Sequence, residues 1–475
     1  MTPNADTPTL HASDVNDASY DFAIPIESRR QDYDPMRVVD AEGAWLTLAD
    51  GRRILDFHSQ YMCVGIGHKH PKITAALHRA VDGIDYVSEI MLHESRVTAA
   101  RLLTQETGDP GHWGGCRFVS SGSEAVEMAI LIARTVTQRP RIVVAQASYH
   151  GWTSSSAAAT SLPHMRNIFH ASEPDAYLSV PTDQPPYLAA PTPGPEADEA
   201  EVERCLVETE RLIRAQGPNQ VAAFMFEIYK GAAGFRVPDS YVRGIRELTS
   251  RLGVLWIDDE AIAGAGRSGK WWSYQHTGVA PDLLVTAKGI GSSAAPAGAV
   301  LISRAISDIL NSGVWYSVST NSGHPLATAA IAATIETVNE EGILSRVTEL
   351  GARLEARLRD MQDRHATIAS ISGRGFGWGI DITAPSGERF SPSDRWYVPG
   401  LDEAPAFNAA EFVAEECLKR DMLTFTFTAN TLTIAPPLSS TADDIEFGLD
   451  ALAAAFEALD ERLSEARGER SGAGI

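Results

Sequence analysis

Short apolar runs alternate with longer helix-like stretches from residue 71 onward, and this alternation restricts the fold more than any other feature of the chain. Strands are predicted at 117–119, 141–145, 222–226, 254–258 and 283–287. Helices are predicted at 71–83, 94–107, 124–136, 199–216 and 238–252. Strands separated by helices favour a parallel sheet covered by helices on both faces, so we predict an α/β fold.

The two ends of the chain have a different sequence pattern from its middle. Residues 1–35 resemble a loose leader, and 45–57 read as a β-hairpin around the turn Asp50-Gly51. After residue 325 we predict a smaller α+β unit, with a frayed tail at 467–475. Its helices are predicted near 325–339, 341–363, 407–420 and 441–464, and its strands near 376–382 and 423–435. The proline-rich stretch 185–195 is predicted to be an exposed loop.

Composition excludes several classes of protein. The 475 residues carry 40 Lys and Arg against 62 Asp and Glu, a net charge of −22, which argues against nucleic-acid and anionic-membrane partners. Four cysteines are scattered without a CxxC pair, which fits reduced thiols in a cytoplasmic protein and offers no metal framework. The polar start, Met1 to Ser19, predicts no signal peptide, and no run of 18 apolar residues predicts a membrane span.

A lysine and an acid fall where two predicted strands end. Lys288 closes the apolar run 283–287, and Asp258-Asp259-Glu260 follows the run 254–257. Parallel strands bring such residues to one crevice at the carboxyl edge of the sheet. Pyridoxal phosphate (PLP) requires both, because a lysine bonds to its aldehyde and an acid pairs with its pyridinium nitrogen. The alternative is a lysine that reaches the surface.

Three further groups belong to the same predicted edge. Ser121-Gly122-Ser123, between a strand and a helix, is suited to bind a phosphate, although the same residues also suit an ordinary helix cap. Tyr149 follows strand 141–145 and is either a stacking ring for a flat cofactor or a core-edge tyrosine. Glu227 follows strand 222–226 and is either a site acid or a cap or salt-bridge residue.

Residues 264–269 match GxGxxG, the fingerprint of dinucleotide-binding proteins. That fingerprint requires a strand directly before it and a helix that opens on its last glycine. Here Ala261-Ile262-Ala263 intervenes, and Lys270 to Tyr274 is a poor helix start. A nucleotide-binding oxidoreductase therefore remains a remote alternative.

Taken together, the sequence from about Gly43 to Leu459 resembles the class III (subgroup II) PLP-dependent aminotransferases of fold type I, and within them the ω-amino acid or amine:pyruvate branch. The resemblance is carried by Leu55-Asp56-Phe57, 65–71, Ser121-Gly122-Ser123-Glu124-Ala125, Tyr149-His150-Gly151, Asp259-Glu260, 264–269, Pro281-Asp282-Leu283, Ala287-Lys288-Gly289, Ser322-Gly323-His324-Pro325 and 435–438.

This resemblance implies a large PLP domain at 71–325, with a mostly parallel seven-stranded sheet, and a smaller domain built from 1–70 and 326–475. Lys288 would bind PLP and move the substrate proton, and Asp259 would hold the pyridine nitrogen protonated. A homodimer with active sites at its interface is also implied. The remaining implied cofactor contacts are Ser121, Gly122, Ser123, Tyr149, His150, Glu227, Ala261 and, from the neighbouring subunit, Thr320.

The implied reaction transfers an amino group from an amine or amino acid to a 2-oxo acid, with pyruvate favoured, by a ping-pong mechanism. A racemase, lyase or decarboxylase on the same scaffold is the alternative. Ala261 stands where relatives usually have a valine packed under the cofactor ring. The floor of the cofactor site is then either looser or filled by Ile262 or Ala263. The predicted substrate pocket contains Tyr61, Met62, Phe425 and Phe427. No arginine occurs between Asp421 and Leu438, where many relatives carry the clamp for a substrate carboxylate.

Overall fold

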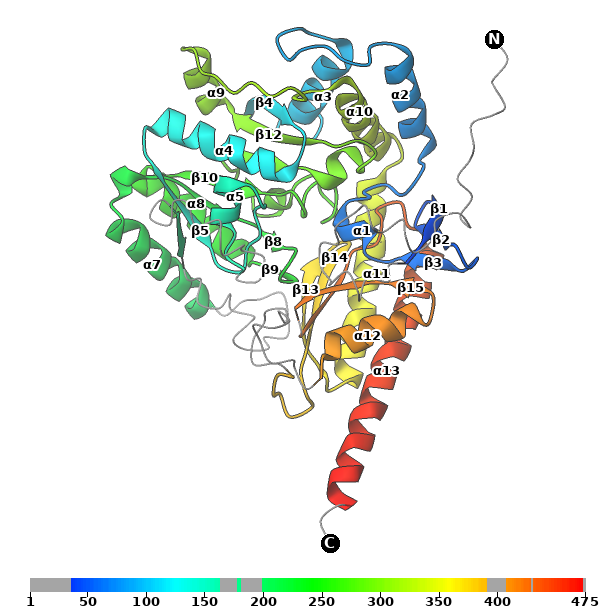
Figure 1. Ribbon diagram of the computed structural model, residues 1–475. Helices are drawn as coiled ribbons and strands as arrows, with labels where there is room; N and C mark the ends of the chain where they lie inside the picture. Colours follow the sequence, from blue (N-terminus) through cyan, green and yellow to red (C-terminus); the bar gives the residue numbers. More distant parts are fainter. Residues whose placement is uncertain (1–35, 163–176, 181–198, 391–406, 429, 473–475) are drawn as a thin grey trace, which may run out of the picture.

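A seven-stranded sheet forms the centre of the molecule (Figure 1). The computed structural model describes residues 36–162, 177–180, 199–390, 407–428 and 430–472. Along the sheet the strands are β4 (Trp113–Val119), β12 (Gly298–Ser303), β11 (Leu283–Thr286), β10 (Leu255–Asp259), β7 (Val221–Phe226), β5 (Arg141–Ala145) and β6 (Tyr177–Val180).

The sheet is mostly parallel, as predicted. β12 pairs antiparallel with both β11 and β4, and the other pairs along the sheet are parallel. The carboxyl ends of β4, β5, β7, β10 and β11 therefore share one edge of the sheet. β12 was not predicted from the sequence. The prediction relied on a helix between successive strands, and no α-helix separates β11 from β12.

Alternate residues of each strand enter two separate hydrophobic cores. On β11, Leu283 and Val285 pack in a core with α4 (Gly122–Thr137) and α9 (Arg304–Asn311), whereas Leu284 packs in the larger core. The larger core contains α3 (Glu94–Gln105), α7 (Glu199–Ala215) and α8 (Asp239–Leu252). This two-residue period determines which core each strand-end side chain faces.

The two outer parts of the chain pair with each other. The predicted hairpin is β2 (Trp45–Leu48) and β3 (Arg53–Asp56), which form a four-stranded sheet with β1 (Val38–Glu42) and β15 (Met422–Leu423). A second four-stranded sheet contains β13 (Ile368–Arg374), β14 (Gly377–Ile382), β17 (Thr431–Ile434) and β16 (Phe425–Thr428). The domain boundaries at residues 70 and 325 stay a prediction.

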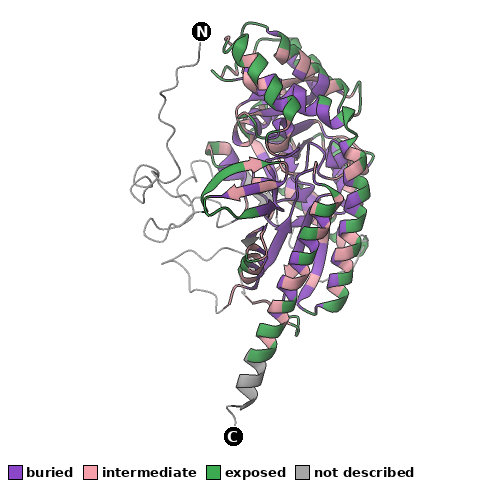
Figure 2. Cartoon of the chain, turned by 90° about the vertical axis from the view of Figure 1, so that its right-hand side faces the viewer, coloured by how far each residue is buried: buried purple, intermediate pink, exposed green. Residues whose placement is uncertain are grey.

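The remaining long helices begin close to their predicted bounds, and all but the last also end close to them. Exposed residues lie along their outward faces (Figure 2). These helices are α2 (Pro71–Asp82), α10 (Pro325–Glu340), α11 (Ile343–Arg364), α12 (Ala409–Leu418) and α13 (Ala442–Gly472). The frayed tail predicted from residue 467 is wrong, since α13 continues to Gly472. The predicted leader 1–35 and loop 185–195 lie outside the described residues. Among the described helices, none is long and apolar enough to cross a membrane.

Candidate active site

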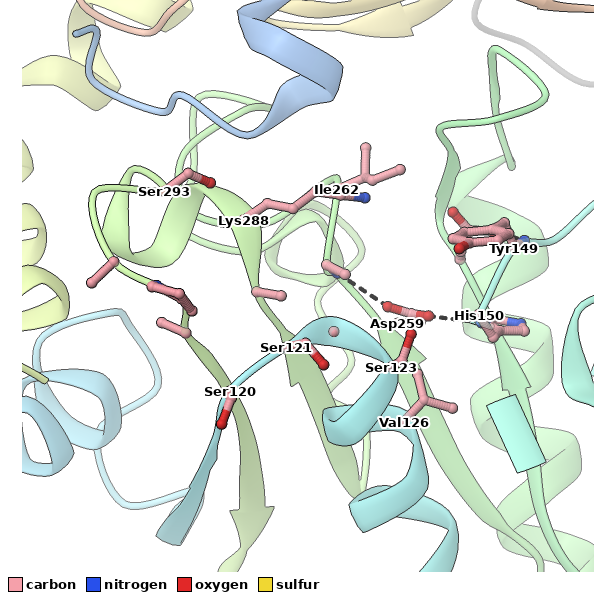
Figure 3. A pocket seen from close by; sticks show the side chains of 18 residues that line it. Ser120, Ser121, Ser123, Val126, Tyr149, His150, Asp259, Ile262, Lys288 and Ser293 are labelled. Atoms are coloured by element: carbon pink, nitrogen blue, oxygen red, sulfur yellow. Dashed lines mark hydrogen bonds and ion pairs between the residues drawn. The ribbon is translucent and has the colours of Figure 1, made fainter. Parts of the chain in front are cut away.

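A cavity of about 370 Å³ lies at the carboxyl edge of the seven-stranded sheet, and Figure 3 shows the side chains around it. Nine of the predicted cofactor contacts line it: Ser121, Gly122, Ser123, Tyr149, His150, Glu227, Asp259, Ala261 and Lys288. They come from the ends of five parallel strands. The topology thus brings together groups that are separated by up to 167 positions in the sequence.

Lys288 follows β11 and begins a short turn, Lys288–Gly291. Its backbone φ is +43°, a left-handed conformation that costs a residue other than glycine about 1–3 kcal/mol and is concentrated at functional sites. Figure 3 shows its side chain extending toward Ile262. Within the part of the chain that the structure describes, its amine has no hydrogen-bond or ion-pair partner. The amine is therefore available to a cofactor.

The carboxylate of Asp259 is held between two donors. His150 Nδ1 lies 2.7 Å from Asp259 Oδ2, and the Ala261 N–H donates to Asp259 Oδ1 over 3.1 Å (Figure 3). The other ring nitrogen of His150, Nε2, is buried and has no partner among the described residues. Asp259 is thereby fixed in the cavity, as the sequence predicted.

Asp258 has the opposite environment. It shares the sheet face of Trp256, in the larger core, and neither of its carboxylate oxygens has a hydrogen-bond partner in the described structure. Burial and the neighbouring charge of Glu260 raise its pKa well above the ordinary value. Only Asp259 therefore faces the cavity with an oriented carboxylate.

The N-terminus of α4 lines the cavity, where the helix cap predicted at Ser121-Gly122-Ser123 is confirmed and the phosphate site stays a prediction. Ser121 caps the helix, since its Oγ accepts from the Glu124 N–H over 3.2 Å, and it also lines the cavity. Ser123 Oγ accepts from the Trp152 N–H. The backbone at residue 151 approaches Ser123 so closely that only glycine fits. Its φ is +130°, and a Cβ atom added there would lie 2.5 Å from Ser123 Oγ. The helix dipole and nearby N–H groups favour a phosphate.

Tyr149 and Glu227 form another wall. Glu227 Oε1 accepts from the Tyr149 N–H over 2.9 Å, and Glu227 Oε2 accepts from the Gly231 N–H over 3.3 Å. Burial, and to a lesser extent the charge of Asp259, raise the pKa of Glu227. The same two causes raise the pKa of Tyr149. The ring is therefore neutral at physiological pH and suited to stacking.

Other predicted site residues lie away from this cavity. Thr320 is exposed, and its carbonyl accepts from the Tyr86 hydroxyl. Tyr61 stacks on Phe425 with ring centroids 4.5 Å apart. Met62 is buried in a cluster that includes Ile262, which does line the cavity. Phe427 belongs to β16, but its side chain lies outside the described structure.

Two further features bear on what the cavity can bind: arginines from elsewhere in the chain, and the GxGxxG segment 264–269. Arg267, within 264–269, is buried and donates to the carbonyls of Pro436 and Phe376. Arg374 pairs with Asp239 over 3.0 Å. Neither lines the cavity, and within the described structure no other arginine does. No α-helix opens on Gly269, and only the short 3₁₀ helix Ser273–His276 follows it, so the dinucleotide geometry does not form there.

Sequence reasoning missed several residues of the site. Ser293 lines the cavity and follows the turn that begins at Lys288. Ile262, one of the two residues named beside Ala261, also lines the cavity, and Ala263 does not. Lys230 is buried and lies 82 positions after Ser148 in the sequence. Its Nζ nevertheless donates to Ser148 Oγ over 2.6 Å. The only sequence signal for this contact was a lysine three residues after Glu227.

The residues present fit PLP. An amine without partners, an oriented carboxylate and a helix N-terminus surround one cavity, which matches the aldehyde, the ring nitrogen and the phosphate of that cofactor. No group of His, Cys, Asp and Glu in the described chain is arranged to hold a metal ion.

Comparisons with known proteins agree with this geometry. The family model described as aminotransferase class-III matches residues 26–456. An acetylornithine aminotransferase from Mycolicibacterium smegmatis is 30% identical over 433 residues, which cover 90% of this chain and 95% of the relative. The structure of an S-selective transaminase from Arthrobacter sp. with alanine bound is 34% identical, with a TM-score of 0.87 over 94% of this chain and 98% of that one. A taurine:2-oxoglutarate aminotransferase from Bifidobacterium kashiwanohense, in complex with PLP and glutamate, is 26% identical, with a TM-score of 0.88 over 96% and 99% of the two chains.

Proposed function

The chain belongs to the class-III aminotransferase family, and we propose that this PLP enzyme transfers the amino group of a primary amine or ω-amino compound to pyruvate. The observation that carries the choice of substrates is the absence of arginine from the cavity lining in the described structure. Membership of this family also makes the nucleotide-binding oxidoreductase alternative wrong.

The proposed roles of the residues follow from their positions. When bound, PLP supplies a ring that withdraws electrons from the substrate carbon. Lys288 holds the cofactor and then moves a proton at that carbon. Asp259, oriented by His150, keeps the ring nitrogen protonated. Ser121, Gly122 and Ser123 at the start of α4 hold the phosphate, and Tyr149 packs against the ring.

The choice of pyruvate as the amino acceptor follows from the charges around the cavity. The distal carboxylate of 2-oxoglutarate requires a cationic partner when it is taken out of water, and a buried charge left unpaired costs several kcal/mol. Arg267 and Arg374 are bound to other groups, and Glu227, which lines the cavity, would repel a second carboxylate. Pyruvate has no distal carboxylate. The alanine-bound relative is consistent with this choice, since alanine is the amino form of pyruvate.

The test compares kcat/KM for pyruvate and 2-oxoglutarate with one shared primary-amine donor. We expect pyruvate to be the better acceptor by at least about tenfold, which corresponds to about 1.4 kcal/mol. A preference for 2-oxoglutarate would mean that a guanidinium clamp exists and would refute the proposed acceptor. Loss of the cofactor's visible absorbance on adding the donor alone separates transamination from racemase or lyase chemistry.

A homodimer is the proposed assembly. Two neighbouring segments, linked by the hydrogen bond from the Tyr86 hydroxyl to the Thr320 carbonyl, expose large apolar side chains. These are Ile90, Leu92, Val314, Tyr316 and Val318, each at least 74% exposed. Such a patch is typical of an interface. It would bring Thr320 of one subunit toward the phosphate site of its partner.

Sedimentation measurements test the dimer. We expect Val314→Asp to shift the protein toward monomer and to weaken PLP binding, because a carboxylate is costly at a buried interface. Val207→Asp, at an exposed valine on α7, is the matched control and should change neither property. A wild-type protein that sediments as a monomer would refute the assembly.

We also propose a cytoplasmic location. The four cysteines, Cys63, Cys116, Cys205 and Cys417, are all unpaired thiols, as expected in a reducing compartment. Cell fractionation with an antibody against the chain tests this location, and recovery from a secreted fraction would contradict it.

A further inference from the structure

A buried lysine lies behind the wall that carries Tyr149. Lys230 ends the short strand β8 (Tyr229–Lys230) and is 1% exposed. Its Nζ donates to Ser148 Oγ over 2.6 Å, and Ser148 is itself fully buried. A lysine in such a position is costly unless a negative charge balances it. Lys230 does not line the cavity, so it does not touch the cofactor directly.

The negative charges that act on Lys230 are those of Glu227, the larger effect, and Asp259. Within one short stretch, Glu227 accepts from the Tyr149 and Gly231 N–H groups while Lys230 donates to Ser148. Opposite charges three residues apart thus bind two consecutive residues, Ser148 and Tyr149. Other charged or titratable groups around them are Asp259 and His150.

The protonation state supports this arrangement. Burial lowers the pKa of Lys230 to about 8, against the opposing charges of Glu227 and Asp259, so the amine keeps its proton at neutral pH. Burial raises the pKa of Glu227, while His150 and Lys230 oppose that rise. Lys230 is therefore one of two groups, with His150, that favour the charged carboxylate of Glu227, which is the stronger acceptor for two N–H groups.

We propose that Lys230 is a positioning residue: as the buried counter-charge of Glu227, it holds Ser148 and Tyr149 in place and thereby fixes the aromatic wall of the cavity. For its consequence in catalysis this inference rests on the proposed PLP site. The charge pair itself is independent of that site and is testable in cofactor-free protein.

The experiment is a double-mutant cycle of Lys230→Met and Glu227→Gln, with Lys270→Met as the control at an exposed lysine. The first readout is the melting temperature of cofactor-free protein. We expect Lys230→Met to lower it by at least about 3 °C, and Glu227→Gln to lower it in the wild-type background. In the Lys230→Met background, Glu227→Gln should raise it, because it removes the unbalanced acid. If Lys230 acted through packing alone, the effect of Glu227→Gln on the melting temperature would have the same sign in both backgrounds.

The second readout is the titration of cofactor-free protein with PLP, together with the circular dichroism of the bound cofactor. Lys230→Met should weaken binding by about tenfold and change the dichroic band, since Tyr149 is displaced, and Lys270→Met should do neither. Lys230→Met behaving like the control, or Glu227→Gln being harmful in both backgrounds, would overturn the proposal. If Lys230→Met does not fold, recovery of folded protein in the double variant supports the proposal, and failure to recover it refutes the proposal.

Discussion

Asp258 and Asp259 are consecutive residues of β10, yet their carboxylates lie in different surroundings. The alternation of a strand sends one toward the core with Trp256 and the other into the cavity beside His150. The first has no hydrogen-bond partner among the described residues, whereas the second accepts from two donors. At the scale of a residue, therefore, one step along the strand separates an acid buried in the core from an acid that lines the cavity.

Replacement of each acid by asparagine tests this difference. Asp259→Asn should keep the fold but lower kcat by orders of magnitude, because a ring nitrogen without a proton makes the cofactor a poor electron sink. Asp258→Asn should have a mild effect on kcat. Turnover and the visible cofactor spectrum of both variants provide the measurement, and the reverse ranking would refute the assignment of Asp259.

Lys288 is expected to carry the cofactor covalently. Reduction of the holoenzyme with borohydride, followed by peptide mass mapping, should find PLP on the peptide that contains Lys288, because its amine reaches into the cavity without another partner. Lys288→Ala should lose turnover. Labelling of the buried Lys230 or the exposed Lys270 instead would contradict this assignment.

At the scale of an element, the first turn of α4 combines a helix cap with the proposed phosphate site. Ser121→Ala removes the cap and should cost about 1 kcal/mol of stability. It should also weaken the binding of PLP. Asn408, whose side chain caps α12 by accepting from the Glu411 N–H over 3.0 Å, offers a matched control away from the cavity. Asn408→Ala should lose similar stability with unchanged PLP affinity. Equal losses of affinity in both variants, measured by titration, would argue against a phosphate site at α4.

The elements also show what a single sequence can reveal. Helices such as α8 and α11 were predicted to within a few residues, because one apolar face repeats along each of them. The strand ends predicted Lys288, Asp259 and Tyr149 at one edge, because parallel pairing follows from the alternation of elements. β12 was missed because a strand that turns straight back leaves no helix to mark it. The contact of Lys230 with Ser148 depends on the register of distant segments, for which one sequence carries no signal.

At the scale of the whole molecule, buried acids give stability a dependence on pH that the net charge alone does not predict. Burial raises the pKa of Asp258 and of Glu227, and it raises the pKa of Glu260 to about 7 despite the N–H groups of Ser273 and Tyr274. The folded chain therefore binds more protons than the unfolded chain above the ordinary range of these groups. His58 and His276 act in the opposite sense, because burial lowers their pKa values to about 3 and about 4. Exposed pairs such as Glu210 with Arg251 also oppose the acids, but solvent weakens them.

The sign follows from linkage. A group whose pKa is higher in the folded state stabilises the folded chain fully at a pH below its unfolded-state pKa. This stabilisation is lost as the pH rises through its folded-state pKa. We therefore expect these acids to lower the melting temperature of cofactor-free protein as the pH rises from about 5 to 8, against the rise that His58 and His276 contribute. Asp258→Asn removes one buried charge, so it should raise the melting temperature at pH 8 more than at pH 5 and flatten the profile. Asp363→Asn, at an exposed acid on α11, is the control and should leave the slope unchanged. A profile as steep in Asp258→Asn as in the wild type would mean that Asp258 is not among the groups that ionise over this range.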